Sequence, residues 1–389
     1  MRAISRGTDD IEGEVLSWYV KESIMKFRCD GLELSEAIST VSKAISSKTT
    51  SQILEGIKMV CENDLLILTA TDLEMSVEKR IRAEVDSRGE TVVPGRLFGE
   101  YIKKLTNEQI ECELNEKNQL KISYTDSEGC LQCMEISEFP AIKEVNKDNF
   151  FEITKEDFKA LINNVFYAVA QDDSRPILKG ILLETNQNTI KAVAVDGCRL
   201  SISNKNLVMS TTDFKIIVPG RNLNEIVKMM NGDDNVKIYV HSNNIMVDLG
   251  DTIVINRLID GQFINYRQIV PKDFSTIVTI NKEQLEDAID RASVLSRIDK
   301  NNLVKFDIKE KNLMLTSNSE IGNTRENITV GVKGNDLNIS FNSKYFSDCL
   351  RVIDNPYVKM NFNSQIQPCV ITPCEGNDFL FLILPVKAR

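Results

Sequence analysis

The stretch Phe151-Glu152-Ile153-Thr154-Lys155-Glu156-Asp157-Phe158 decides the fold, because the chain contains two further versions of it. These are Phe27-Arg28-Cys29-Asp30-Gly31-Leu32-Glu33-Leu34 and Val278-Thr279-Ile280-Asn281-Lys282-Glu283-Gln284-Leu285. Each version predicts a short strand that runs into a helix. Asp30, Thr154 or Asn281 stands at the N-cap, with an acid or amide three residues later. Apolar residues follow at helical spacing, so the chain repeats a strand–helix unit.

A second landmark recurs at nearly the same distance. Residues 92–105 and 217–230 share the run Val-Pro-Gly-Arg, whereas the third version, 340–353, has lost it. Each predicts a strand, a turn and an amphipathic helix, and alternating strands follow at 111–124, 236–249 and 358–372. We therefore predict an α+β chain of three tandem units, each with two helices packed on curved antiparallel sheets. The predicted units are 25–148, 149–273 and 274–389, after an extension of unclear origin at 1–24.

The composition excludes several classes of function. No run approaches the roughly 18 apolar residues of a membrane-spanning helix, and the N-terminus lacks the apolar core of a secretory signal. The formal net charge of −10 argues against a uniformly basic surface for nucleic acid, although the distribution of charge matters more than its sum. The single histidine, His241, is interpreted as a surface strand residue, so most acid–base chemistries lack their usual proton carrier.

The cysteines argue against a disulfide framework or a metal site. Nine of them occur at irregular spacing, which indicates reduced thiols and a cytoplasmic protein. Cys130 and Cys133 form a C-x-x-C, but this pair lies in a strand-like run rather than at the start of a helix, and no second ligand pair is nearby. We expect no metal and no cofactor.

Charge on the predicted helices differs from the average of the chain. The six helical windows 33–47, 96–106, 155–170, 221–230, 282–297 and 344–353 hold 13 Lys and Arg against 11 Asp and Glu. Either these are ordinary solvated helix faces, or they form a mildly positive surface inside an acidic shell. Such a surface could hold a polyanion loosely.

Six motifs, in order along the chain, resemble those of the bacterial DNA polymerase III beta subunit (beta sliding clamp) family. They are Thr71-Asp72-Leu73-Glu74-Met75, Val92-Val93-Pro94-Gly95-Arg96, Asp173-Ser174-Arg175-Pro176-Ile177-Leu178-Lys179-Gly180, Val193-Ala194-Val195-Asp196-Gly197-Cys198-Arg199-Leu200, residues 260–271 and Leu384-Pro385-Val386. The resemblance covers 25–389, and it implies that two chains close head to tail into a ring whose helices line the hole. It also implies a non-catalytic processivity factor that encircles duplex DNA without reading its sequence. The partners would be a second copy of the chain, the polymerase III alpha subunit, the clamp loader and repair polymerases.

The resemblance further implies a groove between the second and third units that accepts short linear peptides from partners. Such a groove combines an apolar floor with a few polar anchors. For its apolar members, core packing is the alternative role. By motif position the groove residues are Leu178, Val195, Gly197, Arg199, Leu200, Ile264, Ile269, Asn342, Tyr345, Ile366, Leu384, Pro385 and Val386.

DNA contact and ring closure carry over by the same resemblance. The expected DNA-binding residues are the loop residues Lys48 and Arg175 and the helix residues Lys43, Lys103, Lys104, Lys159, Lys228 and Arg291. The ring seam is expected to use Val294 and Leu295, with a first-unit counterpart within residues 131–136. Cys198, Gln268 and the tail Lys387-Ala388-Arg389 depart from common members of the family and could alter peptide preference.

Two other hypotheses stay open at this point. The chain could be an interaction scaffold that keeps the repeat but no longer encircles DNA. It could also be a carboxylate-dependent nuclease that uses Asp72 and Asp196, although their equivalent positions in the repeat favour a structural role in a turn.

Overall fold

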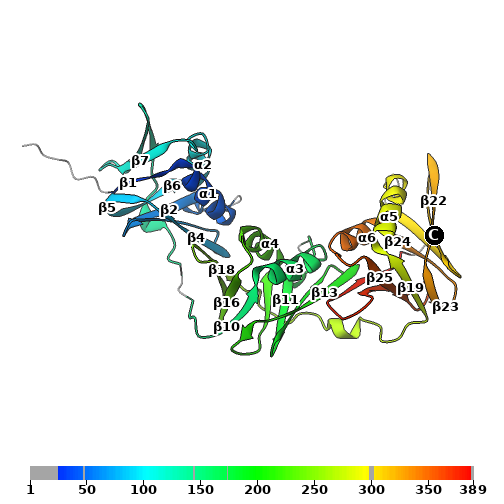
Figure 1. The fold of residues 1–389 in the computed structure, drawn as a ribbon. Helices are drawn as coiled ribbons and strands as arrows, with labels where there is room; N and C mark the ends of the chain where they lie inside the picture. Colours follow the sequence, from blue (N-terminus) through cyan, green and yellow to red (C-terminus); the bar gives the residue numbers. More distant parts are fainter. Residues whose placement is uncertain (1–24, 47–48, 143–144, 173, 298–301, 387–389) are drawn as a thin grey trace, which may run out of the picture.

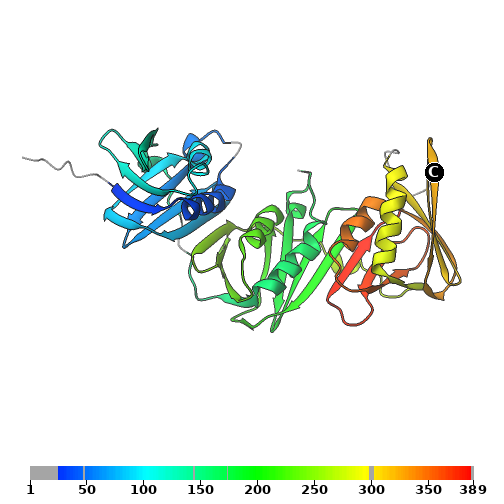
Figure 2. The same ribbon diagram turned by 45° about the horizontal axis from the view of Figure 1, so that its top comes forward.

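The computed structural model describes residues 25–46, 49–142, 145–172, 174–297 and 302–386. The predicted extension 1–24, Lys48 and the tail 387–389 lie outside the described residues. Figures 1 and 2 show three lobes along an arc, with the helices gathered on its concave side and the sheets on its convex side. Within the described residues, no helix is long and apolar enough to cross a membrane.

The three lobes repeat one order of elements, which in the described residues is nine strands and two α-helices per lobe. The first unit contains β1 (Met25–Asp30), α1 (Gly31–Val41), β2 (Gly56–Glu62), β3 (Leu65–Thr71), β4 (Met75–Arg82), β5 (Glu84–Ser87), β6 (Gly89–Pro94), α2 (Gly95–Ile102), β7 (Gln109–Leu114), β8 (Gln119–Tyr124) and β9 (Ser127–Gln132).

The second and third units follow the same order. The second contains β10 (Phe150–Thr154), α3 (Lys155–Phe166), β11 (Gly180–Asn186), β12 (Thr189–Val195), β13 (Arg199–Asn206), β14 (Met209–Ser210), β15 (Lys215–Pro219), α4 (Gly220–Met229), β16 (Asn235–His241), β17 (Asn244–Asp248) and β18 (Thr252–Arg257). The third contains β19 (Thr276–Asn281), α5 (Lys282–Ser296), β20 (Leu303–Lys309), β21 (Asn312–Ser319), β22 (Gly322–Thr329), β23 (Gly331–Gly334), β24 (Leu337–Asn342), α6 (Ser343–Leu350), β25 (Tyr357–Phe362), β26 (Cys369–Pro373) and β27 (Phe379–Ile383).

The predicted N-caps begin the first helix of each unit. The Asp30 carboxylate accepts from the backbone N–H groups of Leu32 and Glu33, at 2.9 and 3.0 Å. The Thr154 hydroxyl accepts from Asp157 N, and the Asn281 side chain from Gln284 N. Each bond satisfies an N–H group that the helix itself leaves unpaired, so the repeated capping pattern is confirmed.

The first predicted helix is shorter than its window of 33–47. The Ser42 hydroxyl donates to Ile38 O at 2.6 Å, and a 3₁₀ turn, Ser42–Ala44, replaces the last α-helical turn. Serine side chains compete in this way for backbone carbonyls. In the third unit, which lacks the Pro-Gly turn, the Asn342 side chain caps α6 instead and accepts from Lys344 N at 3.0 Å.

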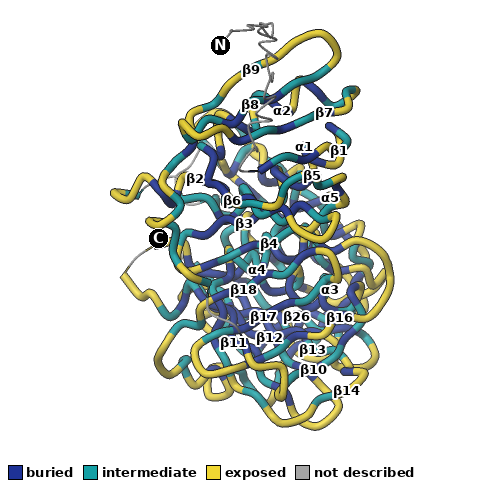
Figure 3. Tube along the Cα trace, turned by 90° about the vertical axis from the view of Figure 1, so that its left-hand side faces the viewer, coloured by how far each residue is buried: buried dark blue, intermediate teal, exposed yellow. Residues whose placement is uncertain are grey.

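Four antiparallel sheets form the convex layer, and two of them cross from one unit to the next. One nine-stranded sheet joins β4 of the first unit to β18 of the second, and the other joins β13 of the second to β27 of the third. A five-stranded sheet ends in β9 at one end of the arc, and a four-stranded sheet ends in β22 at the other. Buried residues lie along the sheets and the inner helix faces, whereas the turns are exposed (Figure 3). Strands β9 and β22 are thus the edge strands of their sheets that lie at the two ends of the arc.

Candidate functional site

The candidate site lies where the second unit meets the third. Strand β13 pairs with β27, and the chain continues past β27 along the turn that precedes β13. Leu384 N donates to Cys198 O at 2.9 Å, and Val386 N donates to Ser340 O at 2.8 Å. These bonds hold the segment 384–386 against the turn at Cys198 in the second unit and against Ser340 in the third.

The apolar members of the predicted groove divide into a buried set and an exposed set. Leu178, Val195 and Leu200 are buried in one hydrophobic cluster, and Ile264 packs against it. Ile269, Leu384 and Ile366 are exposed outside that cluster, at 42%, 39% and 75%. Exposed apolar side chains beside a buried apolar cluster are typical of surfaces that receive a partner. The other two residues of the closing segment, Pro385 and Val386, are half-buried.

Arg199 is largely buried, with a side chain 9% exposed, and it links the two units. Its Nε donates to Asp196 Oδ2 at 2.8 Å, and its NH1 donates to Asp348 Oδ2, on α6 of the third unit, at 2.7 Å. The guanidinium lies 5.1 Å from the ring centroid of Tyr167 and 4.9 Å from that of Tyr345. The resemblance assigned Arg199 to peptide contact; the structure engages it mainly in this junction.

The charges of this network stabilise one another. Burial opposes the charge of Arg199, but the hydrogen bonds to Asp348 and Asp196 hold the pKa of the guanidinium above its usual value. Burial likewise opposes the charge of Asp348, yet Arg199 and Lys344 keep the pKa of this carboxyl below its usual value. The sequence motifs did not identify Tyr167 and Asp348 as members of this network. The i,i+4 spacing of Lys344 and Asp348 on a predicted helix was the sequence signal for Asp348.

Cys198 and Gly197 complete the turn at the edge of the site. A hydrogen bond with Cys198, together with burial, raises the pKa of Tyr345 to about 12. Cys198 is exposed, so the residue that departs from the family pattern contacts one of the predicted peptide anchors. Gly197 has φ +92, and a Cβ there would meet no heavy atom within 4 Å. This glycine is needed for its backbone conformation rather than for space.

The two aspartates of the nuclease hypothesis have structural roles in turns. Asp72 Oδ1 accepts from Glu74 N and Met75 N, at 3.0 and 2.7 Å. Asp196 Oδ1 accepts from Cys198 N and Arg199 N, at 2.9 and 3.0 Å. The described residues contain no group of three or more His, Cys, Asp or Glu that could hold a metal ion. Both carboxylates are therefore engaged in equivalent turns of the repeat, as their spacing predicts.

The predicted DNA-binding side chains differ in their surroundings. Lys103 and Lys104 follow α2 and are exposed, as is Arg175 before the 3₁₀ turn Pro176–Lys179, whereas Lys159 on α3 is half-buried. Three other bases have acidic partners: Lys43 lies 4.0 Å from Glu225, Lys228 lies 2.7 Å from Glu225, and Arg291 lies 2.8 Å from Glu326. The paired bases add less net positive charge to the concave face than a count of residues suggests.

The predicted seam residues lie near the edge strands β22 and β9. Val294, on α5, is 63% exposed, and a Cβ on Gly322 at the start of β22 would lie 3.8 Å from Leu295 Cδ1. Leu131, on β9, packs partly against the core of the first unit. The apolar candidates therefore stand beside β22 and on β9, at opposite ends of the arc (Figure 1).

The remaining sequence features are structural. Cys130 is exposed on β9 and Cys133 follows the strand, where burial raises the pKa of its thiol. His241 is exposed at the end of β16, as predicted.

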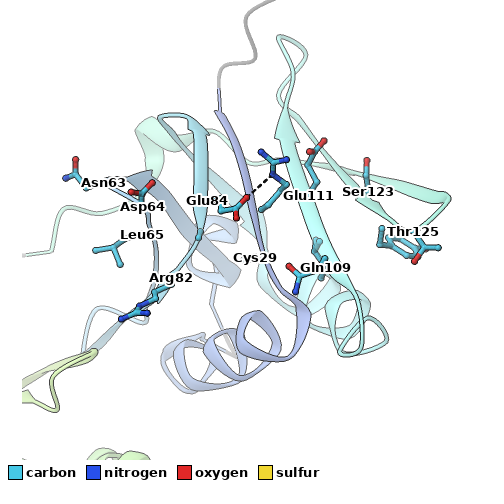
Figure 4. A pocket seen from close by; sticks show the side chains of 14 residues that line it. Cys29, Asn63, Asp64, Leu65, Arg82, Glu84, Gln109, Glu111, Ser123 and Thr125 are labelled. Carbon is cyan, nitrogen blue, oxygen red and sulfur yellow. Dashed lines mark ion pairs between the residues drawn. The ribbon is translucent and has the colours of Figure 1, made fainter.

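A cavity of about 920 Å³ opens in the first unit and is lined by residues of both of its sheets (Figure 4). Arg28, one of the lining residues, forms ion pairs with Glu84 and Asp86.

Comparison with known proteins covers all three units. Family models described as the N-terminal, central and C-terminal domains of the DNA polymerase III beta subunit match residues 25–143, 152–265 and 267–387. The beta sliding clamp of Staphylococcus epidermidis is 33% identical over 356 residues, which is 89% of this chain and 94% of that protein. The Staphylococcus aureus protein of the same name is 32% identical over the same lengths.

Solved structures agree with the sequence comparison. The DNA polymerase sliding clamp from Bacillus subtilis matches with a TM-score of 0.92 and 29% identity, over 94% of this chain and 100% of that chain. A putative DNA polymerase III beta subunit from Eubacterium rectale matches with a TM-score of 0.90 and 31% identity, over the same shares.

Proposed function

The chain belongs to the DNA polymerase III beta subunit family, the beta sliding clamps, and from that membership we propose that two copies close head to tail into a ring around duplex DNA. The protein is a DNA sliding clamp, a non-catalytic processivity subunit used in replication. A ring is retained on DNA by topology, so its contacts can stay weak and independent of sequence. A polymerase bound to it would find its template at high effective concentration.

The joints between units carry the proposal of a closed ring. The fourth strand of one unit pairs with the ninth strand of the next, as β4 with β18 and β13 with β27. Only the fourth strand of the last unit, β22, and the ninth strand of the first, β9, lack this pairing among the described strands. Pairing β22 with β9 of a second copy would combine a four-stranded and a five-stranded sheet into a third nine-stranded sheet. When β22 and β9 of one chain both form this joint with a second copy, two chains of three units close into one ring.

The register of this seam follows from the two joints inside the chain. Ser76 pairs with Ile255 at the first joint, and Leu200 pairs with Leu382 at the second. Asn323 on β22 is equivalent to Ser76 on β4, because Asn318 pairs with Asn323 as Thr71 pairs with Ser76. Cys130 on β9 is equivalent to Ile255 on β18, because Lys121 pairs with Cys130 as Met246 pairs with Ile255. Asn323 would thus pair with the partner's Cys130. Two positions along, the same register sets Arg325 opposite an acidic residue of β9, Glu128.

The concave face supports contact with DNA. The exposed bases Lys103 and Lys104 directly follow its helix α2, and Arg175 is exposed in a loop of the second unit. Lysine and arginine attract phosphates without reading bases, and weak contacts of this kind permit sliding. The net charge of −10 over the whole chain would discourage DNA from adhering to the convex side.

The surface at the second junction supports docking of partner peptides. Its exposed apolar residues Ile269 and Leu384 lie within three residues of Tyr266 and Leu382, which belong to a buried apolar cluster. Ile366 is exposed between β25 and β26, and Tyr345 and Cys198 add polar groups. An extended peptide gains affinity from such apolar contacts and specificity from a few polar ones. We assign this surface to short peptides of the polymerase alpha subunit, the clamp loader and repair polymerases.

Retention on DNA tests the function. The protein is loaded onto nicked circular DNA, and half of the sample is then linearised with a restriction enzyme. A ring held by topology stays on the circles through a gel-filtration column in high salt and leaves the linear molecules by sliding off their ends. Equal retention on both forms would contradict encirclement and favour an ordinary binding surface.

A further inference from the structure

The first junction, between units one and two, repeats the backbone frame of the partner-binding junction. Arg257 N donates to Glu74 O at 2.8 Å, as Leu384 N does to Cys198 O at 2.9 Å. Asp72 caps the turn before β4 as Asp196 caps the turn before β13. The two junctions therefore offer the same framework for docking, at different places on the chain.

The side chains on that framework differ in chemistry. Thr71, Ser76 and Arg257 occupy the positions that Val195, Leu200 and Leu384 hold at the second junction. A cavity of about 310 Å³ lies at this place. Residues of both units line it, among them Thr71, Leu73, Glu74, Ser76, Ile142 and Arg257. The first junction is thus hollow, but its lining is more polar than the apolar surface at the second.

Leu73 occupies an unfavourable conformation on the rim of this cavity. Its φ is +73, in the left-handed region, and its side chain is 62% exposed. The equivalent residue of the second junction is Gly197, for which this region carries no steric cost. The strained backbone and the exposed side chain of Leu73 do not help to stabilise the fold. We therefore infer that this leucine side chain serves a function.

Arg257 and Glu74 are the two charged residues that line the cavity. The Arg257 side chain is exposed, and among the described residues it makes no ion pair. Its planar guanidinium can donate two parallel hydrogen bonds to a carboxylate. Glu74, whose backbone oxygen accepts from Arg257 N, also lines the cavity, so its carboxylate would repel a ligand that carries a run of acidic residues.

We propose that this cavity is a second docking site, separate from the partner groove, for an extended peptide with one acidic side chain next to an apolar one. The acidic side chain binds Arg257, and the apolar one packs on Leu73 and Ile142. The site does not depend on the proposed groove at the second junction, because no residue is shared between them.

The test is a phage-displayed library of random dodecapeptides, selected on the full-length protein. The selected peptides are then synthesised and measured by fluorescence anisotropy on four proteins: the wild type, Leu73→Gly, Arg257→Gln and Leu384→Asp. Leu73→Gly removes the side chain from a position that glycine adopts freely, so its melting temperature should equal or exceed that of the wild type. This variant therefore separates loss of binding from loss of folding.

We expect peptides that pair Asp or Glu with a large apolar residue, that lose at least tenfold in affinity on Leu73→Gly and on Arg257→Gln, and that bind Leu384→Asp as tightly as the wild type. Three results would overturn the proposal: no enrichment, enrichment only of peptides that lose affinity on Leu384→Asp, or peptides that bind Leu73→Gly and Arg257→Gln unchanged.

Discussion

Arg199 NH1 of the second unit lies 2.7 Å from Asp348 Oδ2 of the third, and this ion pair joins the two units beneath the partner-binding surface. The side chains are 9% and 17% exposed, so removal of one partner leaves a charge in poorly hydrated surroundings. We predict that Asp348→Ala lowers the free energy of unfolding by about 2 kcal/mol. Urea unfolding followed by far-UV circular dichroism measures this loss. Asp354→Ala, at an exposed position, is the matched control and should change stability little.

Acid should weaken the same junction. The pKa of Asp348 is depressed in the folded protein, so its contribution to stability is present above the unfolded pKa of about 3.9 and is lost as pH falls through the lower folded value. Asp348→Asn removes this titration. The variant should therefore be less stable than the wild type at pH 7, with the difference narrowing below about pH 4. A difference independent of pH would mean that the carboxylate charge does not contribute.

Binding of partner peptides should depend on the exposed apolar residues of the second junction. Ile366→Ala should weaken a peptide from the polymerase alpha subunit by about tenfold, because truncating an apolar contact of an interface costs roughly 1–2 kcal/mol. Fluorescence anisotropy gives the dissociation constant. Tyr357→Ala, at a residue of β25 that is 53% exposed, provides the control, and an equal loss there would contradict the assignment.

DNA affinity should depend on Lys103 and Lys104. Replacing both by alanine removes up to two phosphate contacts per chain, so the slope of log K against log salt should become shallower by up to about 1.8 per chain. The measurement is a salt titration of binding to a duplex. Lys311→Ala, in the turn between β20 and β21, combined with Lys333→Ala on β23, changes two exposed positions outside the helices and should leave the slope unchanged. If both pairs of substitutions change the slope equally, DNA does not bind preferentially to the concave face.

Local features of this fold could be predicted from the sequence, and long-range ones could not. The N-caps Asp30, Thr154 and Asn281 are contained in runs of a few residues, so the repeat and its helices follow from spacing alone. The pairing of β4 with β18 joins residues far apart along the chain, and no local pattern specifies it. The same limit applies to the site. Motif position predicts that Leu178, Val195 and Leu200 belong to one site, and the structure buries them in one cluster. The surroundings of Arg199 depend on Tyr167 and Asp348, which only the folded junction brings together.

Ring closure through β9 and β22 is the central claim, and one substitution tests it. In the proposed register, Asn323 pairs with the partner's Cys130, which is exposed. Directly paired residues of antiparallel strands have Cα atoms roughly 4.5–5.5 Å apart, within the range that a disulfide spans. Asn323→Cys, oxidised at micromolar concentration and analysed on a non-reducing gel, should give a covalent dimer that adding Cys130→Ser abolishes. A product that stays monomeric, or that forms a ladder of longer polymers, would contradict the closed two-chain ring.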